Sequence, residues 1–233
     1  MFTPTKAYAS TFTVLACIVL TGCPSMPMMT TAKTIGNGKN EIIIAPGVVG
    51  FNAGIVGSKT SSDVGATVTL PDVTLGYRRG IGDSFDLGLT LTGFGRFQID
   101  GKVNFLGNGK NDRFALALDP TLGGVFVGAG SVSGGYVDFG LPLLMDLAVS
   151  DNVRFTLGPR YRGTYVFGSG GGTGGSSLSN FAGTGFGAEF ILSETVALQP
   201  WGTADYLLNT PESNSAKSAS VLFTAGLAIK LHF

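Results

Sequence analysis

The carboxy-terminal stretch of this chain alternates between two kinds of side chain. The even positions from 220 to 232 are mostly small or polar. The odd positions are all apolar: Val221, Phe223, Ala225, Leu227, Ile229, Leu231 and Phe233. Successive side chains of a β-strand point to opposite faces, so a period of two predicts a strand with one continuous apolar face. That face must be covered, either by a protein core or by lipid.

The same alternation recurs along most of the chain. Between residues 97 and 105, for example, Phe97, Ile99 and Val103 oppose polar residues on the other face. Pattern and turn residues together predict ten strands, at 40–48, 66–79, 85–95, 97–106, 113–127, 134–149, 152–166, 181–192, 195–208 and 219–233. Eight or twelve strands remain compatible with the sequence, because strand boundaries are loosely determined by such patterns.

The size of the side chains on the two faces separates a membrane barrel from a soluble one. The apolar set is bulky, whereas the opposing set is small or charged, in a chain with 37 glycines and only 13% charged residues. A soluble barrel places its apolar side chains inside, where a small barrel has little room. A membrane barrel places them outside, against lipid. The sequence therefore predicts an all-β, antiparallel, up-and-down transmembrane β-barrel. It contains no apolar run long enough for a transmembrane helix.

The predicted connections differ in length. Short turns at 80–84, 107–112, near Asp151 and at 193–194 alternate with longer connections at 49–65, 128–133, 167–180 and 209–218, apart from a tight break near Gly95. Short turns on one side of the membrane and long loops on the other are typical of outer-membrane barrels. The 167–180 stretch is interpreted as a mobile outer loop. Its glycines at 170, 172 and 175 match G-x-G-x-x-G only formally, since no strand–turn–helix unit surrounds them.

The amino terminus reads as an export signal. Lys6 precedes an apolar run at about 13–20 that is too short to span a bilayer. The run ends in Leu20-Thr21-Gly22-Cys23, which resembles the lipobox of bacterial lipoproteins. The resemblance implies cleavage before Cys23, with a covalent lipid on that cysteine. The alternative is an ordinary signal peptide that happens to end in cysteine.

The expected domain organisation follows from this signal. Residues 1–22 form a lipoprotein signal peptide, 23–38 a lipidated linker and 39–233 the barrel. The residue after Cys23 is Pro24 rather than the aspartate that usually retains lipoproteins in the inner membrane, so export to the outer membrane is permitted. Cys17 falls within the signal, and no disulfide framework is possible.

The carboxy terminus carries a second resemblance. A final phenylalanine preceded by alternating apolar residues resembles the signal that outer-membrane barrels present to their insertion machinery. The matching residues are Leu227, Ile229, Leu231 and Phe233. The resemblance implies a location in the outer membrane of a Gram-negative bacterium, lipid-anchored. The expected partners are membrane lipids, the insertion machinery and the lipoprotein export machinery. Nucleic acid is not expected, because the formal net charge is zero.

Charged residues on the faces opposite the apolar ones should line the lumen. The candidates are Asp72, Arg78, Asp100, Lys102, Asp138, Asp146, Arg154, Arg160, Arg162, Glu189 and Lys230. The pattern also places Asp86, Asp119, Asp205 and Arg113 there. Their signs nearly balance, and unpaired buried charges are costly. We therefore expect an ion-paired plug in preference to an open polar pore. The three arginines at 154, 160 and 162 share one strand, which leaves a local anion site as a further hypothesis.

No residue pattern in the chain predicts catalysis, a metal site or a cofactor other than the lipid. The one histidine, His232, lies next to the chain end and is interpreted as a rim residue. The leading hypothesis is a non-enzymatic barrel lipoprotein with a structural or surface-exposed role. A narrow porin-like channel for small polar solutes or ions is the first alternative. A lipid-anchored soluble β-barrel that binds an apolar ligand is the second.

Overall fold

The computed structural model describes residues 28–53, 66–93, 95–109, 111–129, 132–170, 173–209 and 221–233. The predicted signal peptide and Cys23 lie outside these ranges. None of the helices among the described residues is long and apolar enough to cross a membrane.

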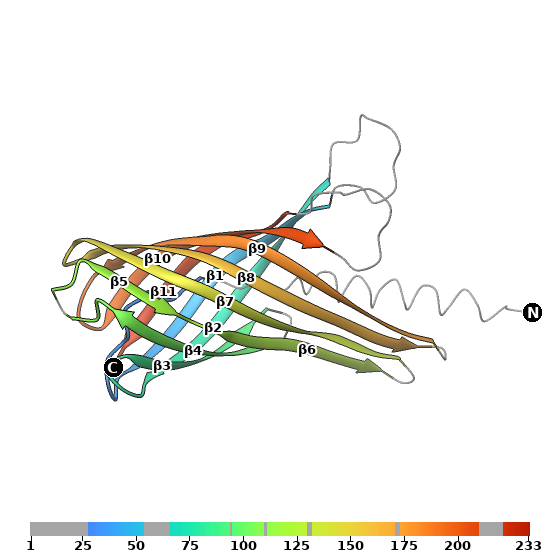
Figure 1. Cartoon of the computed structure of the whole chain (residues 1–233), viewed down its shortest axis with the longest axis horizontal. Coiled ribbons are helices and arrows are strands. Elements are labelled where there is room, and N and C mark those ends of the chain that lie inside the picture. Colours follow the sequence, from blue (N-terminus) through green and yellow to red (C-terminus); the bar gives the residue numbers. More distant parts are fainter. Residues whose placement is uncertain are drawn as a thin grey trace, which may run out of the picture.

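The chain forms a closed antiparallel barrel (Figure 1). Strands that follow one another in the sequence pair with each other, except for the two short strands within 114–129. The first and last strands also pair, with Ile44 opposite Ile229. The strands are β1 (Asn40–Ala53), β2 (Ala66–Gly80), β3 (Phe85–Thr92), β4 (Arg96–Leu106), β5 (Phe114–Leu118), β6 (Thr121–Ala129), β7 (Val132–Ser150), β8 (Val153–Gly170), β9 (Thr173–Ile191), β10 (Val196–Asn209) and β11 (Val221–His232).

The strands β5 and β6 are two halves of one barrel strand, which the sequence pattern had placed at 113–127. Both halves pair with β4 on one side and β7 on the other. The interruption falls at Asp119-Pro120, where proline has no N–H to donate to the ladder. The Pro120 carbonyl oxygen still accepts a hydrogen bond of 3.1 Å from the Gly101 N–H. Counting the two halves as one confirms the predicted ten-stranded barrel.

The two faces of the barrel are the reverse of those in a soluble protein. Bulky apolar side chains stand on the outside, and Phe186, for instance, is 61% exposed. Charged side chains are buried inside, where Arg162 and Asp138 are both 0% exposed. Such an apolar belt is suited to contact with lipid. Because the hydrogen-bonded ladder closes on itself, the barrel does not present a continuous row of unpaired backbone groups to lipid. The predicted fold class is confirmed.

The predicted loop at 167–180 is wrong. The strand β8 continues to Gly170 and β9 begins at Thr173, with Gly168 paired to Gly175. Glycine and serine have low strand propensity, but pairing with a neighbouring strand overrides it. The connection predicted at 128–133 is likewise mostly strand, because β6 and β7 pair up to Ala129 and Val132.

The two ends of the barrel are named here by their connections. The turn end holds the connections at 81–84, 107–113, 151–152 and 192–195 together with Phe233, and the loop end lies opposite. At the loop end, β6 to β9 reach farther than β3 and β4, so the barrel wall is uneven in height (Figure 1).

Candidate functional site in the barrel lumen

The structure places the predicted lumen-lining residues on the inner face. Nine of the eleven are buried: Arg78, Asp100, Lys102, Asp138, Asp146, Arg160, Arg162, Glu189 and Lys230. The side chain of Arg154 is 17% exposed. Asp72 is half-buried near the loop end, beside the turn glycine Gly93. Arg113 differs from the expectation, because it is exposed and precedes β5.

The inward charges are joined in ion pairs between strands that are mostly two apart. Arg78 on β2 lies 2.5 Å from Asp100 on β4 and 3.7 Å from Asp119. The remaining pairs join Lys102 to Asp86 (2.9 Å), Arg96 to Asp138 (2.9 Å), Arg154 to Glu189 (3.0 Å), Lys230 to Glu189 (2.7 Å) and Arg160 to Asp205 (2.5 Å). Pairing offsets part of the cost of removing these charges from water.

The three arginines of β8 are not brought together as one anion site. Arg160 and Arg162 both lie against Asp205, at 2.5 and 3.6 Å. Arg154 instead pairs with Glu189 near the turn end. Each guanidinium therefore faces a carboxylate.

Two luminal contacts involve residues that the sequence pattern missed. Arg96 fell in a predicted break, yet its Nε and Nη2 donate to Asp138 at 2.9–3.1 Å. Extending the period of two from Gln98 and Asp100 would have placed Arg96 inside. Glu41 is 3% exposed and lies 3.3 Å from His232, which keeps the histidine at the rim.

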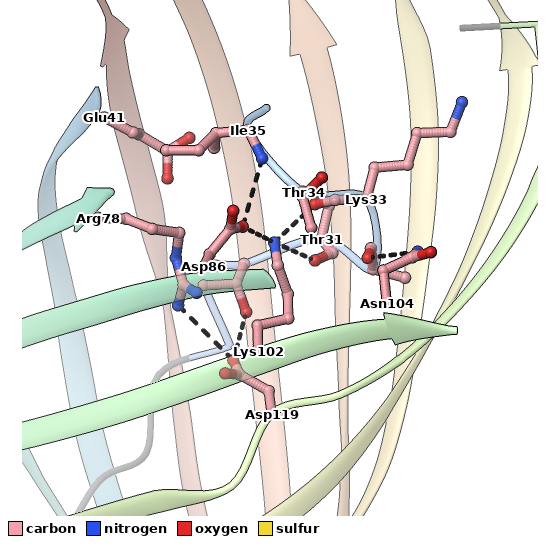
Figure 2. Close-up of polar contacts among 12 residues, drawn as sticks. Thr31, Lys33, Thr34, Ile35, Glu41, Arg78, Asp86, Lys102, Asn104 and Asp119 are labelled. Carbon is pink, nitrogen blue, oxygen red and sulfur yellow. Dashed lines mark hydrogen bonds and ion pairs between the residues drawn. The ribbon is translucent and has the colours of Figure 1, made fainter. Parts of the chain in front are cut away.

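The most unexpected feature of the lumen is the segment Met28–Gly38, here called the luminal segment. The sequence suggests that this stretch is a linker, but it runs inside the barrel (Figure 2). It enters at the turn end, where Gly38 donates to the Gly80 carbonyl and the Gly80 N–H to the Lys39 carbonyl, both at 3.0 Å. Its inner part is buried, with Met28 4% and Ala32 0% exposed.

Two side chains of β4 donate hydrogen bonds to the backbone of the luminal segment. Lys102 Nζ donates to the carbonyl oxygens of Thr31 (3.0 Å) and Lys33 (2.6 Å). Asn104 Nδ2 donates to the Ala32 carbonyl at 3.0 Å. Three successive carbonyl groups of the segment are thus satisfied by the barrel wall (Figure 2).

Carboxylates elsewhere in the barrel wall accept hydrogen bonds from the same segment. Asp146 Oδ2 accepts from the Lys33 N–H at 3.2 Å, and Asp86 Oδ2 accepts from the Ile35 N–H at 3.3 Å. Asp119 Oδ2 accepts from Thr30 Oγ1 at 3.2 Å. These luminal charges therefore bind the segment as well as their ionic partners.

Lys33 contributes mainly through its backbone. Its Nζ donates to the Gly109 carbonyl at 2.8 Å. Burial, and then the nearby positive charge of Arg154, lower the pKa of the Lys33 ammonium group. The carboxylates of Asp112 and Asp146 oppose this shift. The Lys33 N–H donates to Asp146 and its C=O accepts from Lys102, and these contacts hold this part of the segment.

Two glycines make room for the innermost side chain of the luminal segment. A Cβ on Gly185 would lie 2.5 Å from Met28 Sδ and 2.9 Å from Met28 Cβ, and one on Gly158 would also meet Met28 Sδ. Met28 belongs to an apolar cluster with Ala32, Ala115, Ala117 and Leu144. The barrel interior is thus shaped to the segment, rather than loosely filled by it.

Replacing Gly185 with valine tests this fit. We expect the variant to lose about 1–3 kcal/mol of unfolding free energy, because the added side chain overpacks the site. Met28→Ala in the same chain should restore part of the loss. The measurement is urea unfolding of the barrel in lipid vesicles, with Gly175→Val as control, since a Cβ there meets no atom within 4 Å. Equal losses in the two glycine variants would contradict the fit.

A small cavity of about 40 Å³ lies between the luminal segment and the wall. It is lined by Met28 and by charged or polar side chains including Arg78, Asp100, Gln98 and Arg160. Such a volume holds a few water molecules at most. Among the described residues no group of His, Cys, Asp and Glu side chains could hold a metal ion.

Comparisons with known proteins give similarity in structure only. No protein-family model matches the chain, and no curated protein matches it in sequence. The translocator domain of the autotransporter NalP from Neisseria meningitidis is similar with a TM-score of 0.48 and 13% identity, covering 98% of this chain and 97% of that one. The outer membrane protease OmpT from Escherichia coli has a TM-score of 0.47 and 10% identity, covering 87% and 100%. Neisserial surface protein A (NspA) has a TM-score of 0.42 and 14% identity, covering 84% and 98%.

Proposed function

We propose that this protein is a non-enzymatic outer-membrane lipoprotein whose barrel is occluded and whose role is structural or surface-exposed. The observation that carries the proposal is the luminal segment, which occupies the turn-end half of the lumen and is hydrogen-bonded to β3, β4 and β7. A barrel filled in this way serves as an anchor, and its loop end is the part available to the exterior. The turn end then faces the periplasm.

The paired charges support the same proposal. In an open pore, luminal charges would face water and permeating solutes. Here Asp86, Lys102 and Asp146 are each at most 1% exposed, and all three contact the luminal segment. Ions would have to displace both the segment and these pairs in order to cross.

Lipid attachment is supported by sequence alone. The lipobox-like Leu20-Thr21-Gly22-Cys23 precedes the barrel, and the apolar belt of the barrel gives a second attachment to the membrane. Together the two are a stable anchor. The non-enzymatic part of the proposal is supported by His232, which lies at the rim beside Glu41.

A narrow channel is the second candidate. The polar cavity beside Arg78 and Asp100 favours it, because a path could join that cavity if the luminal segment left the barrel. The channel would then depend on movement of that segment.

Single-channel recording in planar lipid bilayers separates the two functions. We expect purified mature protein to insert without discrete current steps. A variant lacking residues 28–35 should give steps, because those residues fill the turn-end half of the lumen. Removal of eight residues from the 54–65 connection is the matched control and should stay silent. Steps from the unaltered protein would overturn occlusion and favour the channel.

A further inference from the structure

Among the described strand residues, Arg79 on β2 is the one charged side chain on the outer face of the barrel. It is exposed and alternates with Leu75 and Tyr77, whereas Arg78 points into the lumen. None of the ion pairs between described residues includes Arg79. A charge on the lipid face is costly near the bilayer midplane and tolerated near the interface. Arg79, one residue from the turn end of its strand, therefore marks the interface there.

Tyr77 marks the same level. Its hydroxyl donates to Asn40 Oδ1 at 2.7 Å, and Asn40 is opposite Arg79 in the register of β1 and β2. Tyrosine is enriched at membrane interfaces, where its ring contacts acyl chains and its hydroxyl reaches the headgroups. Arg79 and the Tyr77 hydroxyl thus both belong to the headgroup level at the turn end.

A groove on the outer face begins at Arg79 and is here called the turn-end groove. Its volume of about 580 Å³ is typical of small-molecule sites. Arg79 is opposite Leu87 on β3, and Leu87 is opposite Gly101 on β4. The Gly101 N–H donates to the Pro120 carbonyl at 3.1 Å. These four residues form one row across the wall, and all four line the groove.

The groove exists because this row lacks bulk at Gly101 and Pro120. The other outward residues of β4 are large and exposed: Phe97, Ile99, Val103 and Phe105. Gly101 alone has no side chain on that face, and Pro120 fills the interruption between β5 and β6. A glycine within a strand often marks a place where another group approaches the backbone closely.

Large side chains border the turn-end groove. The next row towards the loop end consists of Tyr77, Leu89, Ile99 and Leu122. Asp100 also borders the groove, but its own side chain is buried in the lumen against Arg78. The side chains that surround the groove are therefore mostly apolar, with the guanidinium of Arg79 as the outward charge.

The row rises from the turn end into the membrane. Arg79 is one residue from its strand end at Gly80. Gly101 is five residues from its strand end at Leu106. With a rise of 3.3 Å per residue and a tilt near 40°, Gly101 is about 10 Å deeper in the membrane than Arg79. A molecule that lies in the groove thus has one end at the headgroup level and the other among acyl chains.

We propose that the turn-end groove binds one phospholipid of the leaflet at the turn end. Its phosphate contacts Arg79, and one acyl chain lies over Leu87, Gly101 and Pro120. Charge complementarity selects this occupant, because the planar guanidinium of arginine matches the oxygens of a phosphate. The apolar remainder of the groove gains free energy by covering an acyl chain. The site goes beyond the proposed anchor role, since it does not depend on whether the lumen is occluded.

Native mass spectrometry of the full mature protein, delipidated in a non-ionic detergent, tests the site. We expect the protein to retain one added molecule of palmitoyl-oleoyl-phosphatidylglycerol. Arg79→Gln should weaken this binding about tenfold, the usual effect of losing a charge-assisted hydrogen bond. Gly101→Leu should weaken it at least as much, because leucine would occupy the groove. The barrel can accept this change, since a Cβ on Gly101 would lie 3.6–3.8 Å from Phe85 and Leu87.

Two variants are matched controls. Arg113→Gln removes an exposed arginine at the turn end that does not line the groove. Ala204→Leu adds a leucine at an exposed position on the outer face of β10. Both should bind the lipid as the unaltered protein does. Palmitoyl-oleoyl-glycerol, which lacks the phosphate, should bind equally weakly to the unaltered protein and to Arg79→Gln.

Three results would overturn the proposal. Equal binding by all the variants would show only adventitious contact with lipid. Weaker binding by Gly101→Leu but not by Arg79→Gln would exclude the phosphate contact. A dimer of the unaltered protein that Gly101→Leu dissociates would assign the groove to a second copy of the chain. Heat-dependent mobility on a denaturing gel confirms that each variant barrel is folded before its binding is compared.

Discussion

Replacing Lys102 with methionine is expected to lower the free energy of unfolding by about 3–5 kcal/mol, the usual cost of breaking a buried ion pair from one side. Asp86 would remain buried at 0% exposure without its cation, which now lies 2.9 Å away. The carbonyl groups of Thr31 and Lys33 would lose their donor in the same step. The measurement is urea unfolding in lipid vesicles followed by the fluorescence of Trp201, the single tryptophan of the sequence.

Two further variants make this result specific. Lys39→Met removes an exposed lysine at the rim and should change the unfolding free energy by no more than about 0.5 kcal/mol. Adding Asp86→Leu to Lys102→Met removes both charges and should recover much of the loss, because replacing a whole buried pair is often neutral. A loss below 1 kcal/mol for Lys102→Met alone would show that water readily reaches this part of the lumen.

Replacing Phe186 with arginine tests the membrane-spanning fold itself. Phe186 is 61% exposed on β9, so in a soluble barrel the new charge would face water at little cost. Against lipid near the bilayer midplane, an arginine costs about 2–4 kcal/mol, falling to about 0–1 near the interface. We expect the larger loss for Phe186→Arg, measured by the same unfolding assay in vesicles.

Leu192→Arg is the matched control for the lipid face. Leu192 is 62% exposed, almost the same as Phe186, but lies at the turn end just after β9. Its replacement should cost about 0–1 kcal/mol if it sits near the membrane interface. Equal losses for the two variants would argue against a lipid belt centred on Phe186.

The strand count and the two faces could be predicted from the sequence. Where alternation is strict, as in β11 and β4, each residue's face follows from its position in the chain. The inward direction of Asp100 and Lys102 was therefore accessible without a structure. The interruption at Asp119-Pro120 was not, because alternation on both sides of it continues as if one strand ran through.

The extent of the hairpins and the partners of the charges depended on tertiary structure. The Gly- and Ser-rich stretch at 167–180 has no alternation of its own. Its residues 167–170 and 173–180 form strand because β8 and β9 each supply the other's hydrogen bonds. Similarly, the pattern gives Arg160 and Arg162 the same face but does not say that both meet Asp205 on β10. Strand order and register decide such contacts.

The sequence by itself determined that this chain forms a barrel with an apolar outside and a charged inside, since a period of two assigns every strand residue to a face. Only the tertiary structure decided what fills that inside. The sequence of the luminal segment shows no repeating pattern of apolar and polar residues. The wall binds this segment through single backbone groups at Thr31, Ala32, Lys33 and Ile35. Backbone N–H and C=O groups are common to nearly all residues, so their binding leaves no pattern in the sequence.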